Sequence, residues 1–270
     1  MSAKFSRPDS CIISFSLIGG LIVFLTVLSL LNISFAQLGD IPYLISVASE
    51  SKVIESVLLT LGAGLNTVIL LLILGTPLAY VLARVDFKGK GFIEGLVDLP
   101  IMLPHTVAGI LVYILFMRRG IIGEPLGTLG FVFEDAYPGI VAAMFFVSSP
   151  YYINTVREGF EKVPVHLENV ARTLGATRFT AFRKIVLPLS VRHIFSGSVL
   201  AWGRAIGEFA AVIMIAYYPM IISTLIYYRF TTSGLKESST IAFIIIVICF
   251  VVFATLRLLI KRLEGYDERV

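Results

Sequence analysis

The chain has 270 residues, of which 57% are hydrophobic and only 15% are Asp, Glu, Lys or Arg. Soluble domains carry about 25% charged residues. This composition and a mean hydropathy of +0.91 therefore exclude an ordinary water-soluble protein and place the chain in a bilayer. The formal net charge of +4 does not require a nucleic-acid partner, because the basic residues follow the loop pattern of a membrane protein.

Six segments are long and apolar enough to cross a membrane as helices, for which about 20 residues are needed. In chain order they are 11–33, 56–82, 92–117, 137–158, 191–217 and 239–260. The segment 218–238 is too polar and too interrupted to be a seventh span. We therefore predict an all-α integral membrane fold, with a single transmembrane domain over residues 1–270 and its core at 56–260.

The first segment also has features of a secretory signal peptide, because Lys4 and Arg7 precede the apolar run and small residues follow it. A signal peptide has an apolar region of roughly 7–15 residues, and the 11–33 segment is longer, so a retained helix is the preferred interpretation. Cys11 and Cys249 lie within apolar segments, where a thiol usually packs as a small hydrophobic group. We predict no disulfide between them.

The distribution of Lys and Arg predicts the orientation, since cytoplasmic loops carry the excess. Sixteen of these residues lie at the two termini and in the loops that follow the second and fourth segments. The opposite loops hold only five: Lys52, Arg118, Arg119, Arg229 and Lys236. Both termini are therefore predicted to face the cytoplasm, together with the polar loop between the fourth and fifth segments.

This polar loop, at residues 164–188, has the pattern of two short helices. Pro164 can begin the first helix, and Gly175 suits a left-handed stop after it. Thr177 can cap the second helix, and Pro188 is expected to interrupt regular hydrogen-bond pairing before the next span. Such a helical elbow presents side chains that a soluble partner could bind and move.

The loop resembles the cytoplasmic coupling loop of binding-protein-dependent ABC importer permeases, commonly written E-A-A-x-x-x-G-x9-I-x-L-P. The half from Gly to Pro matches at every defined position. Asn169 fills the commonest place of the Glu, and Glu168 lies one residue earlier, which weakens a specific role for its carboxylate. The alternative is an ordinary amphipathic loop in which Glu168 pairs with Arg172 one turn away. The resemblance implies ATPase coupling by Glu168, Ala171, Arg172, Gly175, Ala176, Phe179, Phe182, Ile185, Leu187 and Pro188.

Two further stretches resemble the molybdate, tungstate and sulfate permeases within this class. They read EGLVDLPIMLPHTVAG, from Glu94 to Gly109, and RAIGEFAAV, from Arg204 to Val212. The corresponding stretches of those permeases typically read V-D-L-P, then P-P-T-V, and later R-A-x-G-E-F-G. His105 stands where a second Pro is usual and Ala210 replaces the second Gly, and both departures affect local helix geometry because Pro and Gly control kinks and close packing.

Ionisable residues inside a membrane usually face the bundle interior, a water-filled path or a partner. Arg204 and Glu208 lie four apart on one helix face, so we favour a neutralising pair with a packing role over direct contact with substrate. His105 has no second ligand at helical spacing, so we interpret it as a packing histidine and predict no metal site. The candidates for the pathway and gate are Asp98, Thr106, Ser198, Arg204 and Glu208.

The chain lacks a G-x-x-x-x-G-K-[ST] motif, so nucleotide chemistry is expected on another subunit. The resemblance implies a six-span permease, preferably a homodimer, with two cytoplasmic ATPase subunits that bind ATP and Mg. It also implies an extracytoplasmic molybdate- or tungstate-binding protein that docks on the outer loops. The chain itself would be no enzyme, would hold no cofactor and would lie in the cell inner or cytoplasmic membrane. The alternatives are sulfate or another small anion as substrate, and an ion-coupled secondary transporter with a relay through the charged residues of the spans.

Overall fold

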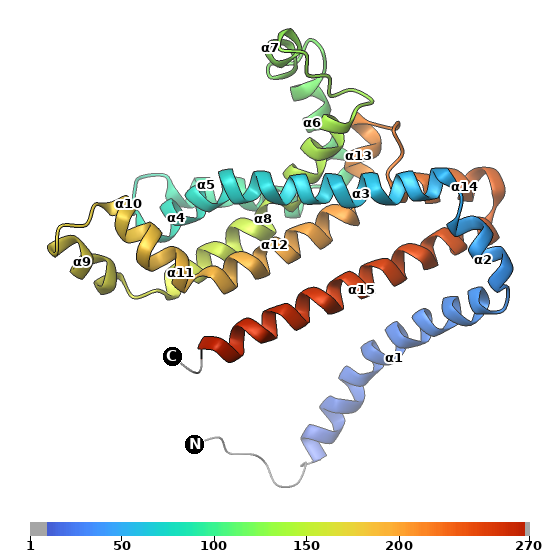
Figure 1. The fold of residues 1–270 in the computed structure, drawn as a ribbon, viewed down its shortest axis with the longest axis horizontal. Helices are drawn as coiled ribbons and strands as arrows, with labels where there is room; N and C mark the ends of the chain where they lie inside the picture. Colours follow the sequence, from blue (N-terminus) through green and yellow to red (C-terminus); the bar gives the residue numbers. More distant parts are fainter. Residues whose placement is uncertain (1–9, 268–270) are drawn as a thin grey trace.

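The computed structural model describes the backbone of residues 10–267 and the side chains of residues 12–256, and every regular element in these ranges is helical (Figure 1). The long elements are α1 (Ser10–Leu38), α3 (Ser51–Leu70), α8 (Tyr137–Lys162), α12 (Val191–Ile206) and α15 (Leu235–Asp267). The shorter α-helices are α2 (Ile41–Ala48), α4 (Thr76–Arg84), α5 (Lys90–Met102), α6 (His105–Phe116), α7 (Gly123–Thr128), α9 (Val165–Thr173), α10 (Arg178–Ala181), α11 (Leu187–Leu189), α13 (Ala210–Ile215) and α14 (Ile222–Ser233). Two turns of π-helix are η1 (Leu71–Gly75) and η2 (Phe182–Val186). The predicted all-α class is confirmed.

Four continuous helices within the described residues are long and apolar enough to span a membrane. They cover Ile12–Leu38, Ser51–Arg84, Tyr137–Lys162 and Leu235–Leu256. Two further pairs meet the same criteria together although each is bent: α5 with α6, by 116°, and the Arg178–Leu189 helix with α12, by 70°. Six spans result if each bent pair counts as one, which agrees with the predicted number.

The predicted third and fifth spans are nevertheless not single helices. The segment 92–117 breaks at Pro104, which lacks an amide hydrogen and has an extended ψ of 132°. The segment 191–217 stops being helical at Ile206, and residues 207–209 separate α12 from α13. Here the carboxylate of Glu208 accepts a hydrogen bond of 2.7 Å from the amide of Ala211, which starts a new helix instead of continuing the old one.

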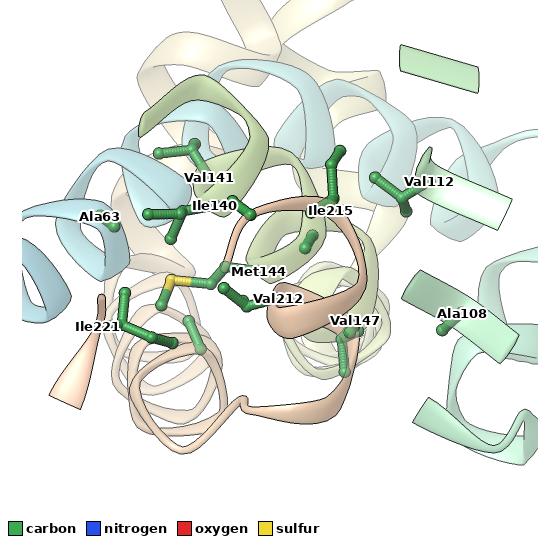
Figure 2. Close-up of a cluster of buried hydrophobic side chains, with 14 residues drawn as sticks. Ala63, Ala108, Val112, Ile140, Val141, Met144, Val147, Val212, Ile215 and Ile221 are labelled. Atoms are coloured by element: carbon green, nitrogen blue, oxygen red, sulfur yellow. The ribbon is translucent and has the colours of Figure 1, made fainter. Parts of the chain in front are cut away.

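Helix α8 occupies the middle of the molecule, and 61% of its span window is buried. Because other helices cover it on several sides, its buried residues are not confined to one stripe. Met144 and Val147 of α8 lie in one buried cluster with Val212 and Ile215 of α13 (Figure 2). The short α13 is therefore held against the central helix by apolar packing.

The second span, α3–η1–α4, is fixed to α8 by a close contact at its π-turn. A Cβ atom on Gly75 would lie 2.9 Å from the ring of Tyr152, so the two backbones approach closely only because Gly75 has no side chain. The hydroxyl groups of Thr76 and Tyr152 are 2.7 Å apart. At the junction of η1 and α4, the adjacent residues Gly75 and Thr76 thus combine close packing with a buried hydrogen bond.

The end of the molecule that carries α2 and α14 is held by polar contacts (Figure 1). The guanidinium of Arg229 in α14 pairs with Glu50, at an Nη2–Oε2 distance of 2.6 Å, and with Glu237 in α15. Lys236 pairs with Asp40 at 3.1 Å. With 12 residues, α14 is too short to cross a bilayer, which agrees with the prediction that 218–238 is not a seventh span.

Helices α1 and α15 lie at the edge of the fold. None of the span window of α1 is buried, and only 11% of that of α15 is. In Figure 1, α1 and α15 are close at the end that carries α2, and α1 diverges obliquely from α15 toward its own first turn. Such predominantly apolar, uncovered surface suits contact with lipid.

Candidate functional site

The polar loop forms the two helices that the sequence predicts. Helix α9 begins after Pro164 and ends before Gly175, whose φ of 92° is left-handed. The amides of Gly175 and Ala176 donate to the carbonyls of Arg172 and Ala171, both at 3.0 Å, so the last carbonyl groups of the helix are satisfied. The predicted left-handed stop is confirmed.

The second helix of the loop begins with the predicted cap and has an irregular end. Thr177 caps it as predicted, because its hydroxyl accepts a 3.1 Å hydrogen bond from the amide of Thr180. The helix continues through Pro188 and bends at Ser190, and its regular hydrogen-bond pairing is interrupted just before the proline, as predicted. The π-turn η2 precedes Pro188, and the amide of Leu187 already bonds five residues back to Phe182. This widened turn accommodates the proline ring.

Glu168 of α9 has specific partners that the sequence did not reveal. Its carboxylate lies 2.6 Å from Nε of Arg84 and accepts a 2.7 Å hydrogen bond from the hydroxyl of Tyr80. Arg84 also donates to the carbonyl of Val163, at 2.8 Å. Glu168 therefore pairs with Arg84 at the end of the second span, rather than with Arg172 one turn away, and its residue exposure is only 7%.

Arg84 connects three elements through these contacts: α4, which carries it; the end of α8 at Val163; and α9 at Glu168. A buried charge without a partner is costly, so this ion pair favours one position of α9 relative to the two spans. No signal along the sequence separates Tyr80 and Arg84 from other residues of the second span. Their contact with Glu168 depends on the tertiary fold.

The other residues assigned to the loop divide into a buried and an exposed set. Phe182 packs in an aromatic cluster, with ring centroids 4.6 Å from Tyr80 and 5.9 Å from Phe160. Ala171, Ala176, Ile185 and Leu187 are half-buried, whereas Arg172, Gly175, Phe179 and Pro188 are exposed. The loop is thus held from one side and presents its other side outward.

A second cluster of charged residues forms where the two broken spans meet. Nη2 of Arg204 lies 2.7 Å from Oε2 of Glu208 and 3.0 Å from Nε2 of His105. Glu208 is only 2% exposed, and its other oxygen caps α13 at Ala211. The hydroxyl of Ser223 in α14 donates to the backbone carbonyl of Glu208 at 2.9 Å. The pairing of Arg204 with Glu208 is as the sequence predicts, although Glu208 lies outside α12.

The interpretation of His105 as a packed histidine was wrong. Its side chain is 45% exposed, and Nδ1 lies 3.7 Å from Oε2 of Glu208. The signal was present in the sequence, since His105 occupies a place where proline is usual, but its contact with Arg204 requires both helix breaks. Within the described residues no group of three or more His, Cys, Asp or Glu side chains could hold a metal ion.

The five pathway candidates do not form one site. Thr106 is exposed and follows His105 at the start of α6, beside the charged cluster. Asp98 accepts a 2.6 Å hydrogen bond from Asn154 and so braces α5 against α8. Ser198 donates to the carbonyl of Ile194 in its own helix, at 2.8 Å. It faces an apolar groove of about 530 Å³ that Leu58, Trp202 and Val252 also line.

The chain is a multi-pass helical domain with a polar two-helix loop at one end and charged residues at its broken spans. These features together indicate a subunit of a membrane transport system. Residues 75–265 match the family of binding-protein-dependent transport system inner membrane components. The chain belongs to this family.

Two curated relatives illustrate the similarity. The molybdate/tungstate transport system permease protein of Thermococcus kodakarensis is 38% identical over 256 residues, which cover 95% of this chain and 98% of that protein. A sulfate transport system permease protein of Salmonella typhimurium is 33% identical and covers 82% of this chain and 79% of its own length.

Solved structures share the fold. A bacterial alginate ABC transporter, in complex with a periplasmic protein bound to an alginate pentasaccharide, aligns with a TM-score of 0.73 at 19% identity. The alignment covers 93% of this chain and 94% of the transporter chain. At this identity the likeness concerns the fold alone, which is that of ABC importer permeases.

Proposed function

We propose that this chain is the permease subunit of an importer for molybdate or tungstate, driven by ATP hydrolysis on separate subunits. The observation that carries the proposal is the similarity, over 95% of the chain, to a permease of a molybdate/tungstate transport system. The coupling-loop geometry supports it independently, because α9 and α10 form a stable two-helix elbow with an outward face.

The assembly contains two copies of this chain, two cytoplasmic ATPase subunits and an extracytoplasmic binding protein. ATP and Mg bind to the ATPase subunits, so the permease is itself no enzyme and holds no cofactor. The outer loops at 34–55, 117–136 and 218–238 receive the binding protein. When the ATPase subunits close on ATP, they move the two coupling loops and the permease opens outward; hydrolysis reverses the change.

Within the permease, the cluster of His105, Arg204 and Glu208 lies at the gate. Both broken spans meet there, and a break allows the two halves of a span to move separately. The two carboxylate oxygens of Glu208 accept hydrogen bonds from Arg204 and from the amide of Ala211. These contacts favour a structural role for Glu208 over direct contact with an anion. Thr106 and the exposed edge of His105 are the groups that can face the pathway.

The protein lies in the cytoplasmic membrane with the coupling loop and both termini in the cytoplasm. The excess of Lys and Arg in the loops supports this orientation. The last turns of α15 lie on the same side of the molecule as α9–α11 (Figure 1), which supports a cytoplasmic C-terminus beside the coupling loop.

Reconstituted uptake tests the proposal. The permease is placed in liposomes with its ATPase subunit and its binding protein, and uptake of labelled molybdate is measured with ATP, without ATP and with excess tungstate or sulfate. We expect ATP-dependent uptake that tungstate competes with. Uptake driven by an ion gradient in the absence of the ATPase subunit would contradict it and favour a secondary transporter.

Sulfate is the second candidate substrate. The relative from Salmonella typhimurium is named as a sulfate permease and covers 82% of this chain. The same uptake assay separates the two, because a sulfate importer would transport labelled sulfate in the presence of excess molybdate. Binding proteins largely determine substrate choice in such systems, so the assay uses the cognate one.

A further inference from the structure

Helices α6 and α13 are the second halves of the two broken spans, and they pack against each other. A Cβ atom on Gly109 of α6 would lie 2.7 Å from the backbone oxygen of Ala211 in α13, so the two backbones approach this closely only because Gly109 has no side chain. In Figure 1, α6 projects from the long helices and α13 lies beside it. Because packed helices transmit displacement to one another, a movement of either helix also moves the other.

The segment 133–135, which directly precedes α8, is attached to the end of α6. The rings of Phe133 and Phe116, the last residue of α6, have centroids 4.7 Å apart. The carboxylate of Glu134 lies 3.4 Å from Nε of Arg118, two residues beyond α6. Two successive side chains of the segment thus contact the end of the third span.

Asp135 attaches the same segment to the end of α13 by three hydrogen bonds. Its amide donates to the carbonyl of Ile215, the last residue of α13, at 3.1 Å. Its Oδ1 accepts from the amides of Tyr217 and Tyr218, at 2.9 and 3.3 Å. The φ of Asp135 is 45°, in the left-handed region that Asp and Asn adopt more readily than other side chains. Aspartate therefore suits this position in two ways, by its backbone and by its acceptor.

Asp135 and Glu208 hold opposite ends of α13. The carboxylate of Glu208 caps the first turn at Ala211 and pairs with Arg204, which contacts His105. With six residues at 1.5 Å each, α13 is about 9 Å long and moves as one rigid piece. A displacement of Asp135 is therefore passed along α13 to the charged cluster where the two broken spans meet.

A polar cavity of about 470 Å³ separates part of the segment from both helices. Its lining includes residues of α6, of the segment and of the end of α13: Tyr113, Arg118, Glu134, Asp135, Met214 and Tyr217. Where the cavity replaces side-chain packing, the connection between the segment and α13 depends on the hydrogen bonds of Asp135.

We propose that Asp135 is a positioning residue that transmits docking on the outer loops to the gate through α13. The inference rests on the proposed function, in which the 117–136 loop receives the binding protein. When the docked protein displaces the segment 133–135, the hydrogen bonds of Asp135 draw α13 with it, and α13 moves its own cap at Glu208. Loss of the acceptor should uncouple docking from ATP hydrolysis while the docking surface remains.

Stimulation of ATP hydrolysis measures this transmission. The complete transporter in nanodiscs is titrated with molybdate-loaded binding protein, and maximal stimulation and the half-saturating concentration are determined separately. Asp135→Gly removes the carboxylate but adopts the left-handed backbone without strain. We expect maximal stimulation to fall at least about fivefold, the lower end of typical coupling between two sites. The half-saturating concentration should stay within about twofold of wild type, because binding and transmission are separate steps.

Two further variants make the test specific. Asp135→Asn keeps the oxygen that accepts from Tyr217 and tolerates the same backbone, so it should restore stimulation to near the wild-type value. Asp40→Gly removes a carboxylate from another outer loop, where it accepts from the amide of Tyr43 and pairs with Lys236, and should leave maximal stimulation close to wild type. Thermal unfolding of each variant separates loss of transmission from loss of the fold.

The outcomes separate this inference from the proposed function. Unchanged maximal stimulation in Asp135→Gly would overturn the inference, and so would a rise in the half-saturating concentration alone, which would make Asp135 a contact of the binding protein. Basal and stimulated hydrolysis that fall in proportion, with a lower unfolding temperature, would also overturn it and leave Asp135 a structural role only. Failure of the binding protein to stimulate the wild-type transporter at all would instead contradict the proposed function.

Discussion

Two glutamates, Glu168 in the coupling loop and Glu208 between the broken spans, are both buried beside an arginine, but their partners lie at very different distances along the chain. Glu168 is 2.6 Å from Arg84, a residue of another span. Glu208 is 2.7 Å from Arg204, one helical turn away. The first pair fixes the position of one element against two others, whereas the second neutralises a charge locally and begins a new helix. The same chemistry therefore serves tertiary assembly in one place and local helix geometry in the other.

The largest expected effect comes from removal of Arg84. Arg84→Met leaves the carboxylate of Glu168 buried without its ion-pair partner and removes the hydrogen bond to Val163, so we expect a loss of about 3–5 kcal/mol in stability. Thermal unfolding in detergent and uptake should both decline. As a control, Lys162→Met removes the partner of Glu158 in an exposed pair and should leave the unfolding temperature close to wild type, because solvent screens such pairs. Equal unfolding temperatures for the two variants would contradict the tertiary role of the Arg84 pair.

Stability should fall by different amounts when either partner of the Arg204–Glu208 pair is removed. Arg204→Met removes the arginine partner of Glu208, whose side chain is only 2% exposed, and leaves its carboxylate with His105 at 3.7 Å. Glu208→Gln removes the carboxylate partner of Arg204, whose side chain is 19% exposed and keeps its contact with His105. We expect Arg204→Met to cost about 3 kcal/mol and Glu208→Gln less, because the amide can still accept from Ala211.

The double variant Arg204→Met with Glu208→Leu separates packing from transport. It leaves no unpaired charge, so its unfolding temperature should exceed that of Arg204→Met alone, apart from the lost helix cap of about 1 kcal/mol. Labelled molybdate uptake should persist in part. A stable double variant without any uptake would place these residues in the transport pathway, contrary to the packing role.

A backbone change at the coupling loop should affect coupling more than stability. Gly175→Val places a β-branched residue at a φ of 92°, which costs at least about 1–2 kcal/mol and should misalign α9 and α10. Binding of the ATPase subunit and uptake should fall together while membrane insertion persists. Gly89→Val imposes the same strain at a φ of 91° in another exposed turn and provides the matched control. Comparable loss of coupling in both variants would show that position 175 has no special importance.

The smallest effect on stability is expected from cysteine substitutions at exposed positions, which leave the Arg84–Glu168 and Arg204–Glu208 pairs intact. Single cysteines at Lys52 and Thr173, both exposed, are introduced into a chain that lacks Cys11 and Cys249. Stability should change by less than about 0.5 kcal/mol, and the two positions should react with an impermeant thiol reagent from opposite sides of the membrane. Reaction of both from outside intact cells would refute the proposed orientation.

The sequence predicts those features of the molecule that depend on local chemistry. Six apolar segments, the left-handed stop at Gly175, the cap at Thr177 and the pair of Arg204 with Glu208 all follow from spacings of a few residues. The breaks in the third and fifth spans could not be located, because an apolar segment looks continuous until a proline or a capping carboxylate is placed in three dimensions. The partners of Glu168 and His105 were missed for a related reason: each lies far away in the sequence and becomes a neighbour only when the helices pack.

The uncovered surface of α1 has a consequence for how the protein responds to its membrane. The apolar helix Ile12–Leu38 has 27 residues, and at 1.5 Å per residue it is about 40 Å long. A typical hydrocarbon layer is about 30 Å thick. Because little of the protein packs against α1, bilayer thickness has more influence than side-chain packing on its tilt. In a thicker bilayer α1 should stand more upright, whereas the interlocked helices around α8 keep their angles.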